Sequence, residues 1–312
     1  MGHDLVVLYE HPEWQKPLFS ALERRNVRFV PFDLKRAAFD PDSVPEAPLY
    51  FNQASPSAYV RGNTRAVPLA LSLMRSLEMG GARVLNGSRA FALELSKTAQ
   101  AALMQRLGIA HPRTTAFNDV DAGLSAWGDR WPALLKPEQG GSGARMYLLN
   151  SADELARLLR DRPDLWLPDN LLTLQEYFQV DPDRGIVRME FLGGDLLYAM
   201  RVVSHGAFNL CPSETCNPEG GGSQCEMAET PPSWPVEFYP YRGVPDEAVE
   251  AGKKLVSAGG LDVGGIEYLE ARDGRLVFYD INANSNLRAP IAREFGFDPF
   301  ERVVDYLLAH MR

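Results

Sequence analysis

Two alternating segments near the C-terminus predict a β-hairpin that carries polar side chains within an apolar frame. Residues 264–268 and 276–284 are rich in strand formers, and a tight Asp-Gly turn separates them. Asp280 and Asn282 are two residues apart and project from one strand face, while Glu267 lies on the partner strand. Two carboxylates and an amide oxygen in one pocket suit Mg²⁺, which usually holds nucleotide phosphates as well. The alternative is an edge hairpin with solvated polar residues, although strands disfavour Asp and Asn.

The size and charge of the chain limit its class of function. At 312 residues it is too long for one small core and fits two or three packed subdomains. The net charge of −9 argues against a nucleic-acid partner, because broad nucleic-acid binding needs a basic surface. No apolar run is long enough to span a bilayer, and residues 5–9 are too short for a signal-peptide core. We therefore expect a cytoplasmic protein without a membrane partner.

The first 88 residues alternate between strand and helix patterns. Buried-strand patterns occupy residues 5–9, 27–31, 49–52 and 83–86, and helical patterns occupy residues 17–25 and 64–79. The second helix is expected to stop at Gly80 and Gly81. Because strands that alternate with helices form open, mostly parallel sheets, we predict an N-terminal α/β domain over residues 1–88.

The rest of the chain divides into two further units. Within residues 89–174 we predict a helix at 95–107, strands at 133–136 and 145–149, and a helix at 152–160 that begins with a capping box. Within residues 175–312 we predict the end of a strand that starts at 172, a hairpin formed by 185–191 and 195–203, a helix at 245–259, the hairpin described above and a helix at 299–311. The irregular segment 204–243 is long enough to suggest a functional loop.

A lysine followed by a glycine-rich loop is a second signal for chemistry. Lys136 stands at a strand end, directly before a loop that contains Gly140, Gly141 and Gly143. Glycine lets backbone N–H groups wrap phosphate oxygens, and lysine supplies a mobile positive charge. The loop fits neither the Walker A motif nor Gly-x-Gly-x-x-Gly, and by itself it equally fits a plain hairpin. Lys97, which opens the helix before it, would by itself be read as a solvated surface lysine.

The order of these motifs resembles the ATP-grasp superfamily, and within it the RimK-type and LysX-type carboxylate–amine ligases. The resemblance covers about the last two thirds of the chain, and residues 1–88 look like the small domain that precedes the grasp. It implies an α/β, ATP-grasp fold with an N-terminal open α/β (pre-ATP-grasp) domain at 1–88. Two ATP-clasping α+β subdomains would follow, a central or lid subdomain at 89–174 and a C-terminal subdomain with the metal site at 175–312.

The resemblance also implies roles for individual residues. Lys97 and Lys136 match lysines that reach the nucleotide phosphates. Arg188 and Arg201 match arginines that face the γ-phosphate and the developing acyl phosphate, so that Lys136, Arg188 and Arg201 form the implied catalytic set. The remaining implied residues are the lid loop Gly140, Gly141, Ser142 and Gly143, the hinge strand Gln175, Glu176, Tyr177 and Phe178, the metal ligands Glu267, Asp280 and Asn282, and Asn284 near the substrate.

One position departs from the family pattern. RimK-type enzymes commonly have an acidic residue two positions before the arginine that matches Arg188, and this chain has Ile186 there. The ribose contact is therefore left to Asp181 or Asp183.

The chemistry implied by the resemblance needs ATP and one or two Mg²⁺ ions. A substrate carboxylate attacks the γ-phosphate to give an acyl phosphate and ADP, and an amine then displaces phosphate. The implied partners are small-molecule or peptide carboxylates and amines, and related enzymes are often homo-oligomers. Two alternatives remain open at this point, a small-molecule kinase of the same architecture and an ATP-binding regulatory module without turnover. The acidic composition weighs against the kinase, because a phosphorylated substrate needs a basic pocket.

Three further residues are candidates for substrate binding. Arg61 follows the third strand, where open α/β sheets form crevices, and its guanidinium could hold a carboxylate. Arg288 lies just past the metal strand, and Asn209 belongs to the polar loop at 204–243. For both arginines an ordinary surface role is the alternative. The same loop contains Cys211, Cys216, Cys225 and His205, which are compatible with a zinc site, a redox pair or a substrate-covering loop.

Overall fold

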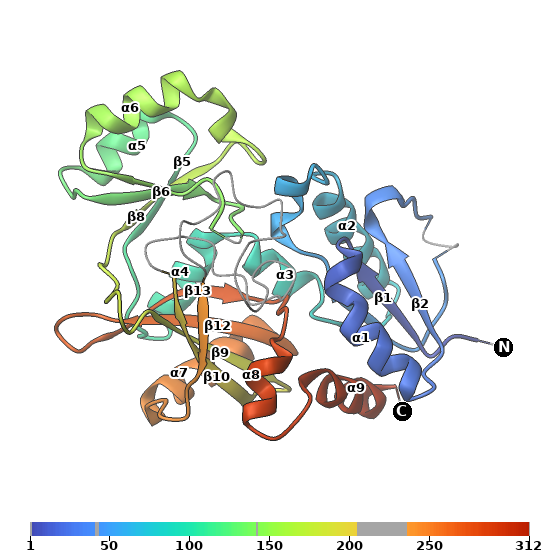
Figure 1. Cartoon of the computed structure of the whole chain (residues 1–312). Helices are drawn as coiled ribbons and strands as arrows, with labels where there is room; N and C mark the ends of the chain where they lie inside the picture. The colour runs from blue at the N-terminus through green and yellow to red at the C-terminus, as the bar shows by residue number, and fades with distance from the viewer. Residues whose placement is uncertain (1, 41–43, 142, 205–235, 312) are drawn as a thin grey trace.

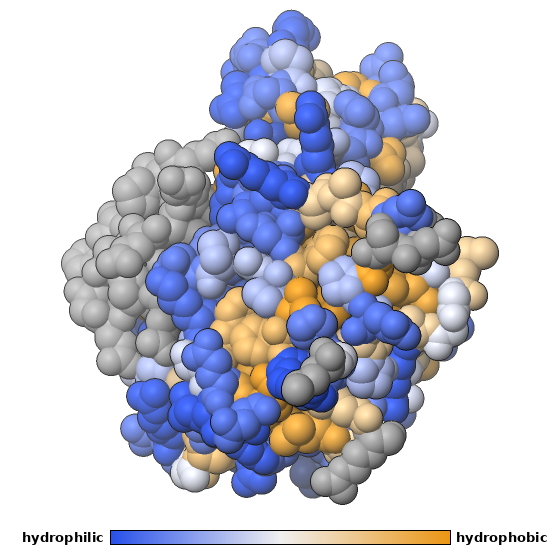
Figure 2. Space-filling model, turned by 90° about the vertical axis from the view of Figure 1, so that its right-hand side faces the viewer, coloured by the Kyte–Doolittle hydropathy of each residue, from blue (hydrophilic) through white to orange (hydrophobic). Residues whose placement is uncertain are grey.

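The computed structural model describes residues 2–40, 44–141, 143–204 and 236–311. Three β-sheets organise these residues (Figure 1). In that view the second sheet and its helices form an upper lobe, the third sheet lies below it, and the first sheet lies to the right. Seen from the side of the first sheet, hydrophilic residues cover most of the upper lobe, and hydrophobic residues are interspersed over the body beneath it (Figure 2). Within the described ranges, no helix combines the length and apolar character that a bilayer crossing requires.

The N-terminal domain is built on a four-stranded parallel sheet, as the alternation of strand and helix patterns predicts. Its elements are β1 (Leu5–Tyr9), α1 (Pro12–Arg24), β2 (Phe29–Asp33), the short 3-10 helix η1 (Leu34–Arg36), β3 (Tyr50–Gln53), η2 (Pro56–Arg61), α2 (Ala66–Met79) and β4 (Val84–Leu85). The strand order is β2-β1-β3-β4. Val6 and Leu8 of β1 pack with Leu73 and Met74 of α2 in a buried cluster, so this face of the sheet forms the core of the domain.

The second sheet is antiparallel and forms the upper lobe. Its elements are β5 (Thr114–Phe117), α5 (Val120–Trp127), β6 (Ala133–Pro137), β7 (Tyr147–Leu149), α6 (Ala152–Asp161), η3 (Pro163–Trp166) and β8 (Leu172–Glu176). The strand order is β5-β8-β6-β7. Helix α6 begins with the predicted capping box: Ser151 Oγ accepts the Glu154 N–H at 3.2 Å, which satisfies a donor at the helix start.

The third sheet is antiparallel and carries the predicted hairpins. Its strands are β9 (Ile186–Leu192), β10 (Asp195–Val203), β11 (Glu237–Pro240), β12 (Val263–Glu270) and β13 (Leu276–Asn282). The strand order is β11-β10-β9-β12-β13. The helices of this half of the molecule are α3 (Ser88–Glu94), α4 (Lys97–Arg106), α7 (Asp246–Gly259), α8 (Ala289–Glu294) and α9 (Pro299–His310).

Helix α4 packs against the third sheet rather than the second. Met104 shares a buried cluster with Ile281 of β13. The Gln100 amide bonds both backbone groups of Ile281, each at 3.0 Å. The elements of the second sheet span 114–176, so the central subdomain predicted at 89–174 starts too early. Helical periodicity identifies the helix, but it does not say which sheet covers its apolar face.

Two β-bulges decide which side chains of the third sheet share a face. The register between β9 and β10 shifts by one residue, and Met200 consequently lies opposite Arg188. The register between β12 and β13 also shifts, and Glu267 consequently lies opposite Asp280. Because side chains alternate along a strand, each one-residue shift moves the following side chains to the other face of the sheet.

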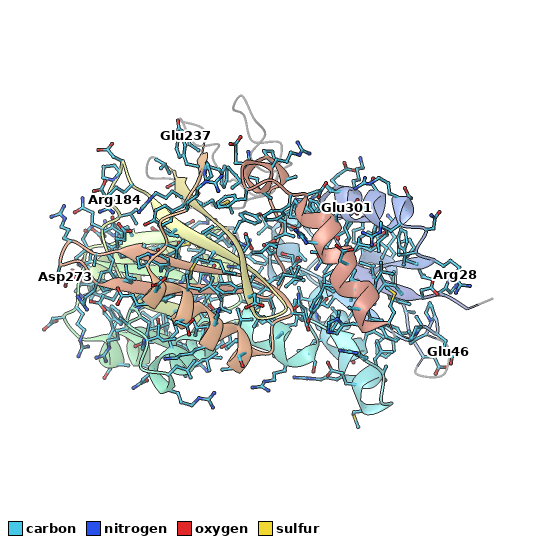
Figure 3. All side chains as sticks on the ribbon, turned by 90° about the horizontal axis from the view of Figure 1, so that it is seen from below. Arg28, Glu46, Arg184, Glu237, Asp273 and Glu301 are labelled. Atoms are coloured by element: carbon cyan, nitrogen blue, oxygen red, sulfur yellow. The ribbon has the colours of Figure 1, made fainter. Side chains whose placement is uncertain are left out.

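The C-terminal helix α9 returns to the N-terminal domain. Leu307 of α9 and Leu18 of α1 belong to one buried cluster. At the edge of this contact Arg24 Nη2 lies 2.6 Å from Glu301 Oε1. Figure 3, which looks from below, shows Glu301 on α9 beside the N-terminal domain and Asp273 at the opposite end of the molecule. The first and last helices of the chain are therefore packed together.

Candidate functional site

A cavity of about 470 Å³ lies where the three sheets meet. Side chains from the N-terminal domain, the upper lobe and the third sheet all contribute to its wall. Most residues proposed from the sequence line it, and these are Lys97, Lys136, Gly140, Gly141, Gly143, Gln175, Glu176, Tyr177, Phe178, Arg188, Glu267, Asp280, Asn282 and Asn284. Four described candidates do not line it, namely Arg61, Asp183, Arg201 and Arg288. Ser142, Asn209 and the three cysteines lie outside the described residues.

The predicted oxygen ligands converge on one part of this cavity. Glu267 and Asp280 are direct neighbours across β12 and β13. Asn282 lies on the same face of β13 as Asp280, and its Nδ2 donates to Asp280 Oδ2 at 3.2 Å. Among the residues that the structure describes, no group of three or more His, Cys, Asp or Glu side chains is placed to hold a metal ion. The donor set therefore consists of two carboxylates and one amide, which are oxygen ligands of the kind that Mg²⁺ takes.

Two cationic side chains balance these carboxylates. Lys97, the first residue of α4, bonds Asp280 Oδ1. Arg188 Nη1 donates to Glu267 Oε1 at 2.6 Å, and the Tyr279 hydroxyl donates to Glu267 Oε2 at 2.8 Å. Burial opposes ionisation of both acids, but Lys97 holds the pKa of Asp280 below its usual value. The pKa of Glu267 is raised by burial despite Arg188, with the charge of Asp280 adding to the rise.

Arg188 is held by a network that sequence reasoning did not identify. Its Nε donates to Glu190 Oε1 at 2.6 Å, and its Nη2 donates to Ser285 Oγ at 3.2 Å. Ser285 Oγ in turn donates to Glu190 Oε2. Burial works against the charge, but Glu190 and Glu267 outweigh it, so the pKa of Arg188 is raised and the guanidinium stays charged. The one available signal for Glu190 was its spacing of two from Arg188 along a strand, which places both on one face.

Lys136 reaches the cavity from the end of β6 and is almost fully buried. Its Nζ donates to Gln175 Oε1 at 2.7 Å on the neighbouring strand β8. Gln175 is itself fixed by donating to Thr114 Oγ1 at 2.9 Å. Burial lowers the pKa of Lys136 to about 8, with the nearby charge of Lys97 adding to the effect. This cation is therefore poorly compensated by the chain itself, which favours an anionic ligand beside it.

The glycine loop after β6 contacts α4 on one side and the N-terminal domain on the other. Glu138 caps α4, since its carboxylate accepts Ser96 Oγ at 2.5 Å and the Thr98 backbone N–H at 3.2 Å. On the other side, a Cβ on Gly141 would stand 2.9 Å from the backbone nitrogen of Ser57 in the N-terminal domain. Only glycine permits this close approach. The loop thus sits between α4 and the N-terminal domain.

The end of β8 and the segment after it form another wall of the cavity. Tyr177 and Phe178 line it together with apolar side chains such as Leu269. Glu176 is exposed on one side and accepts the Arg113 backbone N–H at 3.2 Å. A wall of aromatic and apolar side chains suits a flat heterocycle.

Of the two acidic candidates for the ribose contact, the structure brings only one to the cavity. Asp181 lines the wall, whereas Asp183 does not. Asp181 Oδ1 accepts the backbone N–H of Asp183 at 2.9 Å, which forms a local turn.

The prediction that Arg201 faces the cavity beside Arg188 is wrong. Arg201 lies opposite Val187, so it projects from the other face of the sheet. There its Nη2 donates to Glu270 Oε1 at 2.9 Å, and its guanidinium lies 4.2 Å from the ring centre of Tyr241. The physical reason is the bulge in β10, because a regular hairpin would have placed Arg201 on the same face as Arg188.

Arg61 and Arg288 are also placed away from the cavity lining. The side chain of Arg61 is buried, and its Nε donates to Glu10 Oε1 at 3.2 Å. Arg61 thus binds the carboxylate of Glu10, whereas we expected it to bind a substrate carboxylate. The guanidinium of Arg288 lies 4.1 Å from the ring centre of Phe238, and its backbone N–H donates to the Tyr198 hydroxyl at 2.8 Å. Neither arginine is a surface residue, so both surface alternatives are wrong as well.

Glu94, at the end of α3, is a further residue of the cavity that sequence reasoning missed. Its carboxyl is almost fully buried, and burial raises its pKa to about 8, although the charge of Lys97 opposes the rise. No helix is predicted from the sequence over residues 88–94, so the sequence gives no sign that Glu94 lies inward.

Comparisons with known proteins agree with this architecture. No protein-family model matches the chain. A probable alpha-L-glutamate ligase of Haemophilus influenzae is 22% identical over 249 residues, which cover 79% of this chain and 74% of the relative. Among solved structures, the ATP-grasp ligase PsnB in complex with a minimal precursor matches with a TM-score of 0.67 and 18% identity over 100% of both chains.

Two other solved structures share the arrangement. A RimK domain ATP-grasp protein from Sphaerobacter thermophilus has a TM-score of 0.67 and 16% identity, over 98% of this chain and 99% of the other. D-alanine–D-alanine ligase from Bacillus anthracis has a TM-score of 0.68 and 11% identity, over 100% and 97% of the two chains. At these identities the likeness is one of fold, and it extends over essentially the whole chain.

Proposed function

Because the chain has the fold of the ATP-grasp ligases, we propose that it is an ATP- and Mg²⁺-dependent, ADP-forming carboxylate–amine ligase. In this proposal a substrate carboxylate is activated as an acyl phosphate and is then joined to an amine. The observation that carries the proposal is the composition of one cavity. Lys97, Lys136 and Arg188 line it together with the oxygen donors of β12 and β13.

The barrier to this reaction is the repulsion between two anions and the charge that builds on the transferred phosphoryl group. Fixed cations and N–H donors lower such a barrier because they need no reorganisation during the reaction. We propose that Lys136 and the backbone N–H groups of the glycine loop hold the phosphates, with Lys97 assisting. Arg188 would face the reacting phosphoryl group, since Glu190 and Ser285 fix its guanidinium.

We propose Glu267, Asp280 and Asn282 as the Mg²⁺ ligands. A bound Mg²⁺ would supply positive charge to the phosphate oxygens. The chain's own part is to bring two carboxylates and an amide onto one face of two paired strands. Lys97 and Arg188 compensate the two acids, which limits the cost of burying both charges side by side.

The substrates that we propose are amino acids or peptides on both the acid and the amine side. The relatives support this breadth, because their names include a probable alpha-L-glutamate ligase, a D-alanine–D-alanine ligase and a ligase solved with a precursor peptide. For the nucleotide, we propose that Tyr177 and Phe178 bind the adenine and that Asp181, in place of Asp183, contacts the ribose.

Hydroxamate formation tests the proposal. The protein is incubated with MgATP, hydroxylamine and separate pools of amino acids, dicarboxylates and peptides, and products are identified by mass. Hydroxylamine intercepts an activated acyl group whatever the natural amine is, so a hydroxamate would establish carboxylate activation and identify the acid. A phosphorylated product with ADP but no hydroxamate would replace the ligase proposal with a kinase. Tight ATP binding without ADP release in any pool would favour the regulatory module.

A further inference from the structure

Two residues that line the cavity each carry a buried hydrogen-bond acceptor without a partner among the described residues. These acceptors are Oε2 of Glu94 and Oδ1 of Asn284. Only 4% of Glu94 and 7% of Asn284 is exposed, so the protein shields both atoms from most solvent. A buried acceptor without a donor is costly, and such atoms are rare in folded proteins. Both therefore indicate a place where a ligand supplies the missing donors.

The neighbours of Asn284 fix the orientation of its amide. Nδ2 donates to the backbone oxygens of Gln53 at 2.9 Å and Ala54 at 3.1 Å. Because two carbonyl oxygens require the NH₂ end of the amide, the oxygen must be the end directed elsewhere. The backbone N–H of Asn284 also hydrogen-bonds the Glu94 carboxyl. The two unsatisfied acceptors therefore belong to two residues that contact each other directly.

The charges around Glu94 leave its carboxylate without a dedicated counter-ion. Two cations act on it, Lys97 from α4 and Arg188 from β9, and Asp280 acts on it from β13. Lys97 is already paired with Asp280, and Arg188 is already paired with Glu267. A ligand that is cationic and carries several N–H donors would satisfy both the charge of Glu94 and the two open acceptors.

We propose that Glu94 and Asn284 form the subsite that binds the primary ammonium group of the amine substrate. This inference rests on the proposed ligase function and names the part of the site where the second substrate enters. The ammonium would donate one hydrogen bond to Glu94 Oε2 and one to Asn284 Oδ1. Its third position would remain directed toward the cavity, where the activated carboxyl group lies.

The same carboxylate accounts for the proton that the amine must lose before it can attack. The positive charge of the bound ammonium favours the ionised form of Glu94, and the ammonium then transfers one proton to this carboxylate, which gives a neutral amine and a carboxylic acid. The amine nitrogen then bonds to the acyl carbon, the bond from that carbon to the phosphate oxygen breaks, and the second nitrogen proton leaves with phosphate. Burial raises the pKa of Glu94 to about 8, close to the range of about 7.7 to 8.0 for an α-amino group. Such matching makes the proton transfer nearly balanced, which is the condition for effective base catalysis.

A binding measurement tests the subsite without requiring turnover. Methylammonium chloride is titrated into the full chain with Mg·AMPPNP bound, and its binding is followed by NMR line broadening. We expect saturable binding that weakens about tenfold or more in Glu94→Gln. It should be unchanged in Glu247→Gln, which alters an exposed glutamate on α7. Equal binding by wild type and Glu94→Gln would overturn the proposal, and so would equally effective competition by potassium chloride.

A kinetic measurement separates the subsite from the activation step. With the acid identified by hydroxamate formation, Glu94→Gln is supplied with either hydroxylamine, largely neutral at pH 7, or methylamine, largely cationic. We expect kcat/KM for methylamine to fall about 100-fold while that for hydroxylamine stays near the wild-type value. A parallel loss with both nucleophiles, or no loss with either, would overturn the role of Glu94. Failure of the wild type to form any hydroxamate would instead remove the ligase proposal, and the binding measurement would still decide whether the ammonium subsite exists.

Discussion

Gly265 lies directly against the guanidinium of Arg188, so that a Cβ built on Gly265 would stand 2.7 Å from Arg188 Cζ. Both residues are buried, and Arg188 is held there by Glu190 and Glu267. The absence of a side chain on Gly265 thus leaves the space that the Arg188 guanidinium occupies. We expect Gly265→Ala to displace the guanidinium and to lower kcat about 100-fold, because small misplacements of a reacting group are costly. The change in unfolding free energy should be about 1–3 kcal/mol.

Steady-state kinetics and thermal unfolding check this expectation together. Gly243→Ala is the matched control, since its Cβ would meet only a ring carbon of Tyr241 at 3.6 Å. Full activity in folded Gly265→Ala would show that the position of Arg188 does not matter to turnover.

Asp280→Ala should abolish Mg²⁺-dependent turnover while leaving the protein folded. The substitution removes one proposed metal ligand and the partner of Lys97. ADP release is measured across a Mg²⁺ titration, with unfolding monitored in parallel. Asp195→Ala serves as a control, because the Asp195 carboxylate is 88% exposed. Undiminished turnover in Asp280→Ala would contradict the metal assignment.

Lys136→Ala should weaken nucleotide binding by about 10-fold to 100-fold at pH 7, which is the range for a lost hydrogen bond to a charged group. Because burial lowers the pKa of Lys136 to about 8, the wild-type side chain is cationic below that pH and loses its charge above it. Wild-type affinity should therefore fall as the pH rises beyond about 8, and the affinity of the variant should not. Calorimetry across pH 7–9.5 checks both statements, with Lys254→Ala as an exposed-lysine control. Unchanged ATP affinity in Lys136→Ala would exclude the proposed role.

The burial of Glu94 predicts a pH dependence of stability. Its pKa is raised from 4.5 to about 8, so between these values the folded protein holds a proton that the unfolded chain has released. The free energy of unfolding of the wild type should therefore fall across this window, by at most roughly 4–5 kcal/mol from this group. Glu94→Gln has nothing to titrate, so its stability relative to wild type should rise from pH 4.5 to 8 and then level off. Chemical denaturation at a series of pH values measures the difference, and a flat difference would mean that Glu94 titrates normally.

Glu10→Gln should destabilise the N-terminal domain by about 3 kcal/mol, because it breaks a buried ion pair with Arg61. Glu13→Gln is the matched control, since it alters an exposed pair with Lys16 and should change stability by less than about 0.5 kcal/mol. Urea denaturation distinguishes the two variants. Equal, small effects would mean that Arg61 does not depend on Glu10, and they would reopen the assignment of Arg61 to a substrate.

The fold could be predicted from the sequence to the extent that local patterns and motif order determine it. The parallel N-terminal sheet followed from the alternation of strands and helices, and the order of lysines, glycines and acids matched the ATP-grasp superfamily, which the solved structures confirm as the fold. Strand β5 and helix α5, which the sequence analysis did not identify, are short, at 4 and 8 residues. Short elements give too few periods for their pattern to stand out.

The site could be predicted where a residue's position follows from its own strand. Asp280 and Asn282 share a face because they are two apart, and the structure places them together. Whether a residue of the neighbouring strand joins them depends on register. The bulge in β13 brings Glu267 opposite Asp280, and the bulge in β10 turns Arg201 away from Arg188. A sequence shows alternation within a strand, but it does not show where one extra residue interrupts the pairing.

Partners supplied by distant segments were beyond prediction for a different reason. Ser285 reaches Arg188 from 97 positions away, and the backbone N–H of Asn284 reaches Glu94 from 190 positions away. Only the assembled fold brings such residues together, because their meeting depends on how separate sheets pack rather than on any local pattern.

The contact between α1 and α9 has a mechanical consequence. The N-terminal domain is attached to the third-sheet half of the molecule at several separate points, among them this helix pair, the bonds between Asn86 and Asp262, and the bonds from Asn284 to the backbone of Gln53 and Ala54. A body held at several separate points has little freedom to rock. The upper lobe enters and leaves through neighbouring stretches of chain at 107–113 and 177–185, and it is otherwise tethered through its glycine loop. We therefore expect the cavity to open chiefly by a hinge movement of the upper lobe, while the N-terminal domain and the third-sheet half stay fixed relative to each other.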